Sequence, residues 1–370
     1  MRFVSSAANR YITIDKRKLL NLCSNNYLGL ANDTRLEDAA ITAIKKFGVG
    51  AGASRLVSGS TILHKKLEEK LAQFKQQEAA LVYASGYSAN LGIISSLVGR
   101  NDIVFSDRLN HASIIDGIIL SRAQLVRYPH RDMEALERLL SMRPTPDARR
   151  PTLIVTDSVF SMDGDIAPIP KLLALAKKYD CLLMIDEAHA TGVLGRKGRG
   201  SLEYFEAEVD ERIIQMGTLS KAIGCLGGFV CGSKDLIDYL VNRSRSFIFS
   251  TALPAALCAS ALTAIQIIEK DNTLRQRLKE NARFLRHGLQ DMGFDTLDSK
   301  DTAIIPVVTK EQELTMEFSR RLFQEGIYAQ GIRPPTVPEG LSRLRVTVMA
   351  SHTKSDLEFA LEKFRKIGKK

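Results

Sequence analysis

Cysteine, proline and glycine are too scarce and too scattered in this sequence to define the fold. The 370 residues include five cysteines without a C-x-x-C pair, so we predict neither a disulfide framework nor a zinc site, and we expect reduced thiols. With 25 glycines and 11 prolines, the chain is neither collagen-like nor of low complexity. The amino terminus lacks the long apolar run of a secretory signal, which favours a cytoplasmic protein.

Long hydrophobic runs are also scarce. One stretch, 246–268, carries no charged residue over nearly the length of a membrane span. Pro254 interrupts this stretch, and serine, threonine and glutamine add polarity. We therefore predict a buried helix that begins near Pro254, and no association with a membrane.

Basic residues outnumber acidic ones, with 52 Lys and Arg against 42 Asp and Glu and a net charge of +10. Such a surplus favours anionic partners, for example phosphates, nucleotides or an acidic carrier protein. The basic residues are spread along the whole chain, without a basic tail or an arginine-rich helix that contains aromatic residues. We therefore expect no nucleic-acid partner.

From about residue 78, apolar strands rich in β-branched residues alternate with amphipathic helices. Strands that are apolar throughout are typical of a sheet covered on both faces, and the alternation with helices favours parallel strands. The sequence therefore predicts an α/β fold with a mostly parallel, seven-stranded sheet. The expected strands are Ala79–Tyr83, Ile103–Phe105, Gln124–Tyr128, Thr152–Val159, Cys181–Ile185, Ile213–Met216 and Gly228–Cys231.

The pattern changes at both ends of this central region. Residues 1–50 contain a short strand pair and a helix, and we expect them to pack with a small domain or across a dimer interface. Residues 51–253 form the predicted large domain. Residues 254–370 read as a smaller C-terminal α/β domain that begins with a long helix.

Polar residues follow the strand that ends at Ile185. Asp186 stands at the strand end and His189 follows three residues later. Ligands of open α/β sheets bind at the carboxyl ends of the strands, so both side chains are candidates for one crevice. The alternative interpretation is a helix-capping acid beside a hydrogen-bonded histidine, and this segment alone does not separate the two.

A lysine follows the next predicted strand. Lys221 stands after Thr218 and Ser220 and before Gly224, among small residues that allow a ligand to approach closely. Desolvation at such a place lowers the pKa of an amine toward nucleophilic or general-base duty. The alternative is an ordinary solvent-facing charge.

Three further strand ends carry Gly86 with Tyr87, then His111, and then Ser161. The start of a helix at Gly86 offers backbone N–H groups to a phosphate, and Tyr87 adds an aromatic edge. Together with Lys221 and Asp186, these groups match the needs of pyridoxal 5′-phosphate (PLP). This cofactor needs a lysine that bonds to its aldehyde, a carboxylate that keeps its pyridine nitrogen protonated, a stacking ring and a phosphate cradle.

Six motifs spread over the chain resemble those of the α-oxoamine synthases. These fold-type-I PLP enzymes condense an amino acid with an acyl thioester and release CO2. Within the family, segments 54–59 and 332–338 are similar to those of the members that use L-alanine and a pimeloyl thioester, carried on coenzyme A or acyl carrier protein. Glycine-using acetyltransferases usually differ in both segments. The six motifs are Ser24–Leu30, Gly52–Gly59, Asn110–Ser113, Val159–Gly164, Asp186–His189 and Thr218–Lys221.

The resemblance implies a homodimer in which Lys221 bonds to PLP and later acts as a base, while His111 stacks on the cofactor ring and Asp186 pairs with its nitrogen. It also implies a further N-terminal segment in most members, with a helix and an arginine that reaches the substrate, so we expect its lack here to affect binding of the acyl substrate. Some complexes of the family contain a non-catalytic subunit that has lost the lysine. Because Lys221 is present here, we expect an enzyme rather than such a subunit. The remaining implied contacts are to the ring hydroxyl (Ser161, His189), to the phosphate (Gly86, Tyr87, Thr218 and, from the other subunit, Ser250 and Thr251) and to the substrates (His111, Asn25 and Arg345, with Thr336 on the acyl side).

Overall fold

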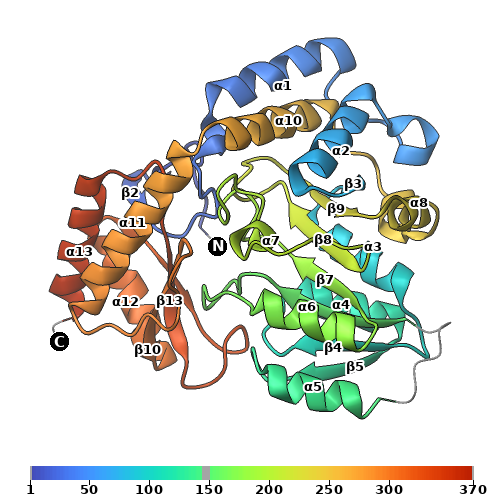
Figure 1. Ribbon diagram of the computed structural model, residues 1–370. Helices are drawn as coiled ribbons and strands as arrows, with labels where there is room; N and C mark the ends of the chain where they lie inside the picture. Colours follow the sequence, from blue (N-terminus) through green and yellow to red (C-terminus); the bar gives the residue numbers. More distant parts are fainter. Residues whose placement is uncertain (1, 144–150, 369–370) are drawn as a thin grey trace. The chain divides into compact units, whose positions relative to one another are not determined.

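The structure is a computed structural model that describes residues 2–143 and 151–368. Its chain divides into two compact units, which we call the small unit and the large unit (Figure 1). The small unit consists of residues 2–33, 161–166 and 271–368, and the large unit consists of residues 34–143, 151–160 and 167–270.

Seven strands form the sheet of the large unit, in the order β3-β9-β8-β7-β6-β4-β5. Strand β9 is antiparallel to both of its neighbours, and the other neighbouring strands are parallel. The predicted mostly parallel sheet of seven strands is thereby confirmed. The strands are β3 (Ala79–Tyr83), β4 (Ile103–Asp107), β5 (Gln124–Tyr128), β6 (Thr152–Asp157), β7 (Leu182–Asp186), β8 (Ile213–Thr218) and β9 (Gly228–Gly232).

Helices connect and cover these strands. Several of them follow a strand directly, so the polar residues at a strand end also form the start of a helix. The helical elements of the large unit are α1 (Thr34–Phe47), the π-helical turn η2 (Arg55–Gly59), α2 (Ile62–Lys75), α3 (Gly86–Leu97), α4 (Ala112–Ser121), α5 (Met133–Ser141), α6 (Ile169–Lys178), α7 (Ser201–Tyr204), α8 (Lys234–Arg243), α9 (Arg245–Ile248) and α10 (Ala255–Lys270).

Both faces of the large sheet are buried, because an apolar cluster lies on each side of it. Successive strand residues point to opposite sides and so belong to different clusters. Val104 belongs to an apolar cluster that includes residues of α3, α4 and α8. Its neighbour Phe105 belongs to a second cluster with residues of α5 and α6. Leu153 and Ile154 on β6 are divided between the two clusters in the same way. This arrangement leaves the carboxyl ends of the strands as the place where polar side chains gather.

The small unit contains two three-stranded sheets, β1-β2-β11 and β10-β13-β12. Strands β11 and β12 are too short, at two and three residues, to give a periodic sequence pattern, and they were not predicted. The elements are β1 (Tyr11–Ile14), β2 (Arg17–Asn21), η1 (Leu30–Asn32), α11 (Thr273–Gln290), β10 (Ile304–Lys310), α12 (Gln312–Gln324), β11 (Ile327–Tyr328), β12 (Gln330–Ile332), β13 (Ser342–Thr347) and α13 (Lys354–Gly368).

The boundaries of the two units differ from the predicted domain boundaries. Helices α1 and α10 both belong to the large unit, where Ala43 packs against Ala256 and Ala259 in an alanine-rich seam. Small side chains let these two helices approach closely. The two helices are far apart in sequence, so their contact could not be predicted from the order of the elements along the chain. Residues 161–166 group with the small unit, where Arg343 forms an ion pair with Asp163.

Helix α10 begins at Ala255, directly after Pro254, so the predicted helix in the uncharged stretch is present. Cys258, Ala261 and Ile265 on this helix are fully buried. Across residues 2–143 and 151–368, the structure contains no helix with both the length and the apolar character that a bilayer crossing requires.

Candidate active site

Two neighbouring strands of the large unit bring Lys221 and His189 together. Lys221 lies in a turn after β8, which is closed by hydrogen bonds from Leu219 N to Gly227 O (2.9 Å) and from Gly224 N to Lys221 O (2.9 Å). His189 is buried in the turn after β7. The Nζ atom of Lys221 lies 3.0 Å from Nε2 of His189. An amine and an imidazole in direct contact are equipped to exchange or orient a proton.

Asp186 ends strand β7 and is almost fully buried, with 4% of its surface exposed. Its Oδ1 accepts a hydrogen bond from Ala188 N at 2.9 Å, and its Oδ2 accepts one from Nδ2 of Asn90 at 2.8 Å. Asn90 Nδ2 also lies 2.8 Å from the hydroxyl oxygen of Ser113. The orientation of the carboxylate is therefore fixed on both oxygens, which suits a group that must face a cationic nitrogen.

His111 is the N-cap of helix α4, and its Nδ1 accepts a hydrogen bond from Ser113 N at 3.3 Å. Desolvation lowers the pKa of His111, and the nearby charge of Lys221 lowers it further, against the opposing effect of Asp186. The neutral form of the ring is therefore favoured at pH 7. A neutral ring of this kind is suited to stacking on another aromatic ring.

Asp157 at the end of β6 lies behind His111. Its Oδ2 accepts a hydrogen bond from the backbone N of His111 at 3.0 Å. Burial raises the pKa of Asp157 well above its usual value, and the charge of Asp186 raises it further. The protonated form of Asp157 is therefore favoured.

The start of helix α3 forms a close contact with the end of β8. Ser85 caps the helix, since its Oγ accepts a hydrogen bond from Ser88 N at 3.0 Å. A Cβ atom added to Gly86 would lie 3.2 Å from Oγ1 of Thr218. The exposed Tyr87 donates its hydroxyl to Asp116, which raises the pKa of Tyr87. Backbone N–H groups and a hydroxyl at this point form a cradle for an anion.

Ser250 and Thr251 lie in a different part of the large unit. They line a small pocket together with Arg55 and His64, and Thr251 pairs with Ser54 in an isolated β-bridge. Burial lowers the pKa of His64 to about 4, so its ring is neutral at pH 7. The contacts of these two residues are thus with the η2 region rather than with Lys221.

Three of the predicted residues meet in the small unit. Arg345 on β13 is buried, and it donates from Nη2 to Oδ1 of Asn25 at 3.1 Å and from Nε to the carbonyl of Ser161. Tyr27 supports this arrangement by donating its hydroxyl to Asn25 Oδ1 at 3.2 Å. Thr336 lies on the exposed loop between β12 and β13. The predicted site residues therefore form separate local groups. In the large unit, one group lies around Lys221 and another contains Ser250 and Thr251, and in the small unit a group lies around Arg345.

Two residues of the site were missed as functional candidates in the sequence. Asn90 is an amide within a largely apolar helix, and Asp157 is an acid at the end of an apolar strand. A buried polar residue within an apolar segment usually has a specific partner, and this signal was available in both cases.

Replacement of Asn90 by alanine is expected to weaken PLP binding by about 10- to 100-fold, because a hydrogen bond to a charged group contributes about 1.5–3 kcal/mol. Titration of the cofactor-free protein with PLP, followed by visible absorbance, measures this affinity. Asn242→Ala serves as the control, because Asn242 is an exposed residue on α8 whose amide donates to the backbone carbonyl of Asp238. Equal PLP affinities of Asn90→Ala and Asn242→Ala would contradict the proposed role of Asn90 in holding Asp186.

The groups of the large unit fit PLP by their chemistry. Lys221 supplies an amine, Asp186 a buried carboxylate and His111 a neutral ring. Gly86 leaves its backbone bare against Thr218, as a phosphate cradle requires.

A mixed seven-stranded sheet with these groups at its edge defines a fold-type-I PLP-dependent transferase. Residues 17–364 match the family model of aminotransferase class I and II. The chain belongs to this family and, within it, to the group of the 8-amino-7-oxononanoate synthases.

Relatives in that group match the chain over its full length. The 8-amino-7-oxononanoate synthase of Geobacter sulfurreducens is 54% identical over 100% of this chain and 94% of its own length, and that of Thermoanaerobacter pseudethanolicus is 51% identical over 96% and 89%. A serine palmitoyltransferase of S. paucimobilis, solved with PLP bound, superimposes with a TM-score of 0.95 at 34% identity and covers 100% of this chain and 92% of its own. The 8-amino-7-oxononanoate synthase of Francisella tularensis superimposes with a TM-score of 0.82 at 29% identity and covers 95% and 98%. The predicted resemblance to the α-oxoamine synthases is thereby confirmed.

Proposed function

We propose that the protein condenses L-alanine with a pimeloyl thioester to give 8-amino-7-oxononanoate, CO2 and the free thiol, as a step of biotin synthesis. In this reaction the α-carbon of alanine forms a bond to the thioester carbonyl carbon, the carbon–sulfur bond breaks, and the carboxylate of alanine leaves as CO2. The observation that carries the proposal is identity of 51–54% to 8-amino-7-oxononanoate synthases over 96–100% of this chain. The groups gathered around Lys221 support it.

We assign the proton transfers to Lys221. When bound, PLP supplies an electron sink for the carbanion that forms at the α-carbon. Lys221 Nζ removes the α-proton and later returns a proton, and His189 orients the amine from 3.0 Å. Asp186, held by Asn90 and by the backbone of Ala188, keeps the pyridine nitrogen protonated.

The other proposed cofactor contacts follow the local geometry of each residue. We assign the stacking contact to His111, whose ring is neutral, and the ring hydroxyl to Ser161 and His189. In this assignment the phosphate lies at the start of α3, where N–H groups and the helix dipole favour an anion. Its proposed contacts are Gly86, Tyr87 and Thr218, with Ser250 and Thr251 from a second copy of the chain.

We assign the carboxylate of alanine to Arg345, because a guanidinium group matches a carboxylate in shape and charge. Asn25 and the carbonyl of Ser161 accept hydrogen bonds from Arg345 and hold it in place. We also assign substrate contacts to His111 and, on the side of the acyl chain, to Thr336.

Arg345→Ala is expected to lower kcat/KM for alanine by roughly 30- to 1000-fold, the loss that accompanies removal of one partner of a buried charge pair. Most of the loss should appear as a higher KM for alanine, while the KM for the thioester stays close to that of the wild type. Arg320→Ala is the control, because Arg320 is exposed on α12 and pairs with Glu317 three residues away. A wild-type KM for alanine in Arg345→Ala would rule out the assignment.

A homodimer is part of the proposal. Large apolar side chains on the large unit are exposed in the single chain, among them Val57 (80%), Phe249 (70%) and Ile119 (66%). A second copy that covers them would remove this apolar surface from water. The five unpaired cysteines are compatible with a reducing cytoplasm as the location.

A matrix of amino acids and thioesters tests the function. Alanine, glycine and serine are each combined with acetyl, succinyl, pimeloyl and palmitoyl thioesters, on coenzyme A and, for pimeloyl, on acyl carrier protein, and CO2 release is followed. We expect the highest kcat/KM for alanine with a pimeloyl thioester. Glycine with acetyl thioester as the best pair would contradict the proposal and indicate a glycine C-acetyltransferase.

A further inference from the structure

The loop between β7 and α7, residues 187–200, carries His189. A buried ion pair between Lys75 of helix α2 and Glu187, the first residue of the loop, holds this loop. Lys75, in the last turn of α2, and Glu187 both have fully buried side chains, with Nζ of Lys75 at 3.9 Å from Oε2 of Glu187. Burial of two charges is costly unless further hydrogen bonds satisfy both groups. The contacts of each partner therefore show what the pair holds in place.

Glu187 fixes the beginning and the end of the loop. Its backbone N donates to Met216 O on β8 at 2.7 Å. Its carboxylate accepts hydrogen bonds from Ser201 N at 3.1 and 3.0 Å and from the Ser201 hydroxyl. Gly200 has a φ of +116°, and a Cβ atom there would lie 2.1 Å from Glu187 Oε2. The carboxylate thus packs directly against the backbone of Gly200.

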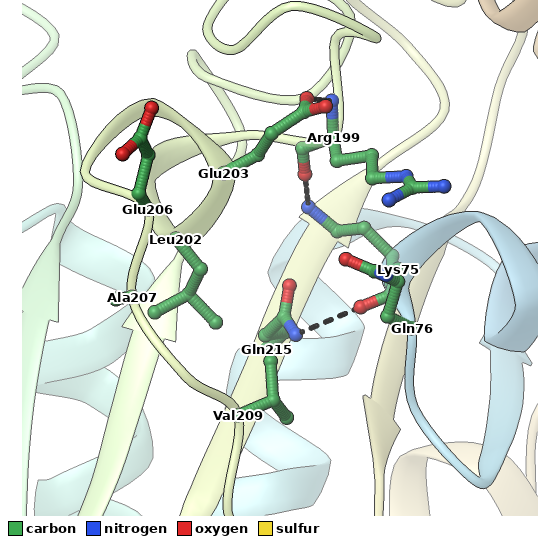
Figure 2. A pocket seen from close by; sticks show the side chains of 9 residues that line it. All are labelled: Lys75, Gln76, Arg199, Leu202, Glu203, Glu206, Ala207, Val209 and Gln215. Carbon is green, nitrogen blue, oxygen red and sulfur yellow. Dashed lines mark hydrogen bonds between the residues drawn. The ribbon is translucent and has the colours of Figure 1, made fainter.

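Lys75 holds the same loop from the side of helix α2. Its Nζ donates to Oγ1 of Thr191 at 3.2 Å and to the carbonyl of Arg199, and the latter contact is visible in Figure 2. The Lys75 side chain therefore contacts the loop at two places, near its beginning at Thr191 and near its end at Arg199. Thr191 is two residues from His189, whose Nε2 contacts Lys221.

We propose that the buried Lys75–Glu187 pair is a positioning device that holds His189 in register with Lys221. The inference rests on the proposed function, since it gives the pair a purpose only where Lys221 transfers protons. Lys75 and Glu187 are positioning residues, because their side chains contact the loop and its junction with α7 rather than Lys221. His189, Asp186, His111 and Asp157 are the titratable groups around Lys221, and the pair acts through the first of them.

The experiment compares Lys75→Met with Lys75→Arg in the PLP-loaded protein. A cavity of about 190 Å³ beside Lys75, lined also by Gln215 and Leu202, gives the larger guanidinium group room (Figure 2). The readouts are the pH midpoint of the visible absorbance and the separate values of kcat and KM. For Lys75→Met we expect a midpoint moved by about 0.4 to 1.5 pH units and a kcat lowered by roughly 3- to 30-fold, with KM little changed. Lys75→Arg should restore both values.

Lys70→Met is the matched control. Lys70 lies on the same helix and also forms an ion pair, with Glu269, but this pair has no contact with the loop. We expect lower thermal stability in this variant without a change in the pH midpoint. If Lys75→Met does not fold, Thr191→Val replaces it, because it removes only the hydroxyl that Lys75 contacts, and the same shift in smaller size is expected.

A wild-type midpoint and kcat in folded Lys75→Met or Thr191→Val would overturn the inference and leave the pair with a purely structural role. Failure of the proposed function is recognised separately. In that case the wild-type protein shows no visible absorbance band with PLP, or shows the band without turning over alanine and pimeloyl thioester.

Discussion

Lys221→Ala is expected to lower kcat by at least about 10⁴-fold, the largest effect that we predict for a single substitution. Proton transfer by a positioned side chain contributes about 10²–10⁴-fold on its own, and the variant also loses the covalent bond to the cofactor. His189, at 3.0 Å from the missing amine, keeps its place but has no α-proton acceptor to orient. Steady-state turnover of alanine with a pimeloyl thioester and the absorbance spectrum measure both losses.

The control for this variant is Lys234→Ala. Lys234 is an exposed residue at the start of α8 and pairs with Asp238 four residues along the helix. Its removal should leave turnover and colour unchanged. Retention of substantial activity by Lys221→Ala would show that a different group removes the α-proton, and the assignment of the base would be withdrawn.

The second large effect is expected for Asp186→Asn. The amide has the size of the carboxylate but carries no charge to keep the pyridine nitrogen protonated, and its NH2 group can face the NH2 group of Asn90, which now donates at 2.8 Å. We expect kcat to fall by about 10²- to 10³-fold, the loss typical of one misplaced electrostatic contact in a site. Activity measurements together with PLP titration separate the loss of chemistry from the loss of binding.

Asp210→Asn is the matched control, because Asp210 is exposed just before β8 and pairs with Arg212. We expect it to behave as the wild type. If Asp186→Asn instead turns over at the wild-type rate with normal PLP affinity, Asp186 does not face the cofactor nitrogen and its burial has a structural cause.

The strands of the large unit were predictable because their sequence signal is local. Residues 79–83 and 124–128 are bounded by turn residues and form β3 and β5 with the predicted limits. The unit boundaries were not predictable in the same way. They depend on contacts between segments far apart in sequence, such as the alanine seam of α1 and α10 and the ion pair of Arg343 with Asp163.

The candidate site shows the same division between local and long-range information. Asp186 ends a strand, and Lys221 and His111 stand shortly after strand ends, so the pattern of strand ends predicts that they gather at one edge of the sheet. The supporting contacts of Asn90 and Lys75 come from helices more than 90 residues away in sequence from the residues they hold. Only the folded chain reveals such partners. The assignment of each role to PLP or to substrate stays a prediction for the experiments above.

Borohydride reduction after incubation with PLP tests the central claim most directly. The claim is that Lys221 forms the covalent link to the cofactor at the edge of the large sheet. Reduction makes this link permanent, and mass spectrometry of the intact chain and of its proteolytic peptides locates it. We predict the addition of one reduced cofactor per chain, on the peptide that contains Lys221. An unchanged mass, or a cofactor attached to another lysine, would contradict the account.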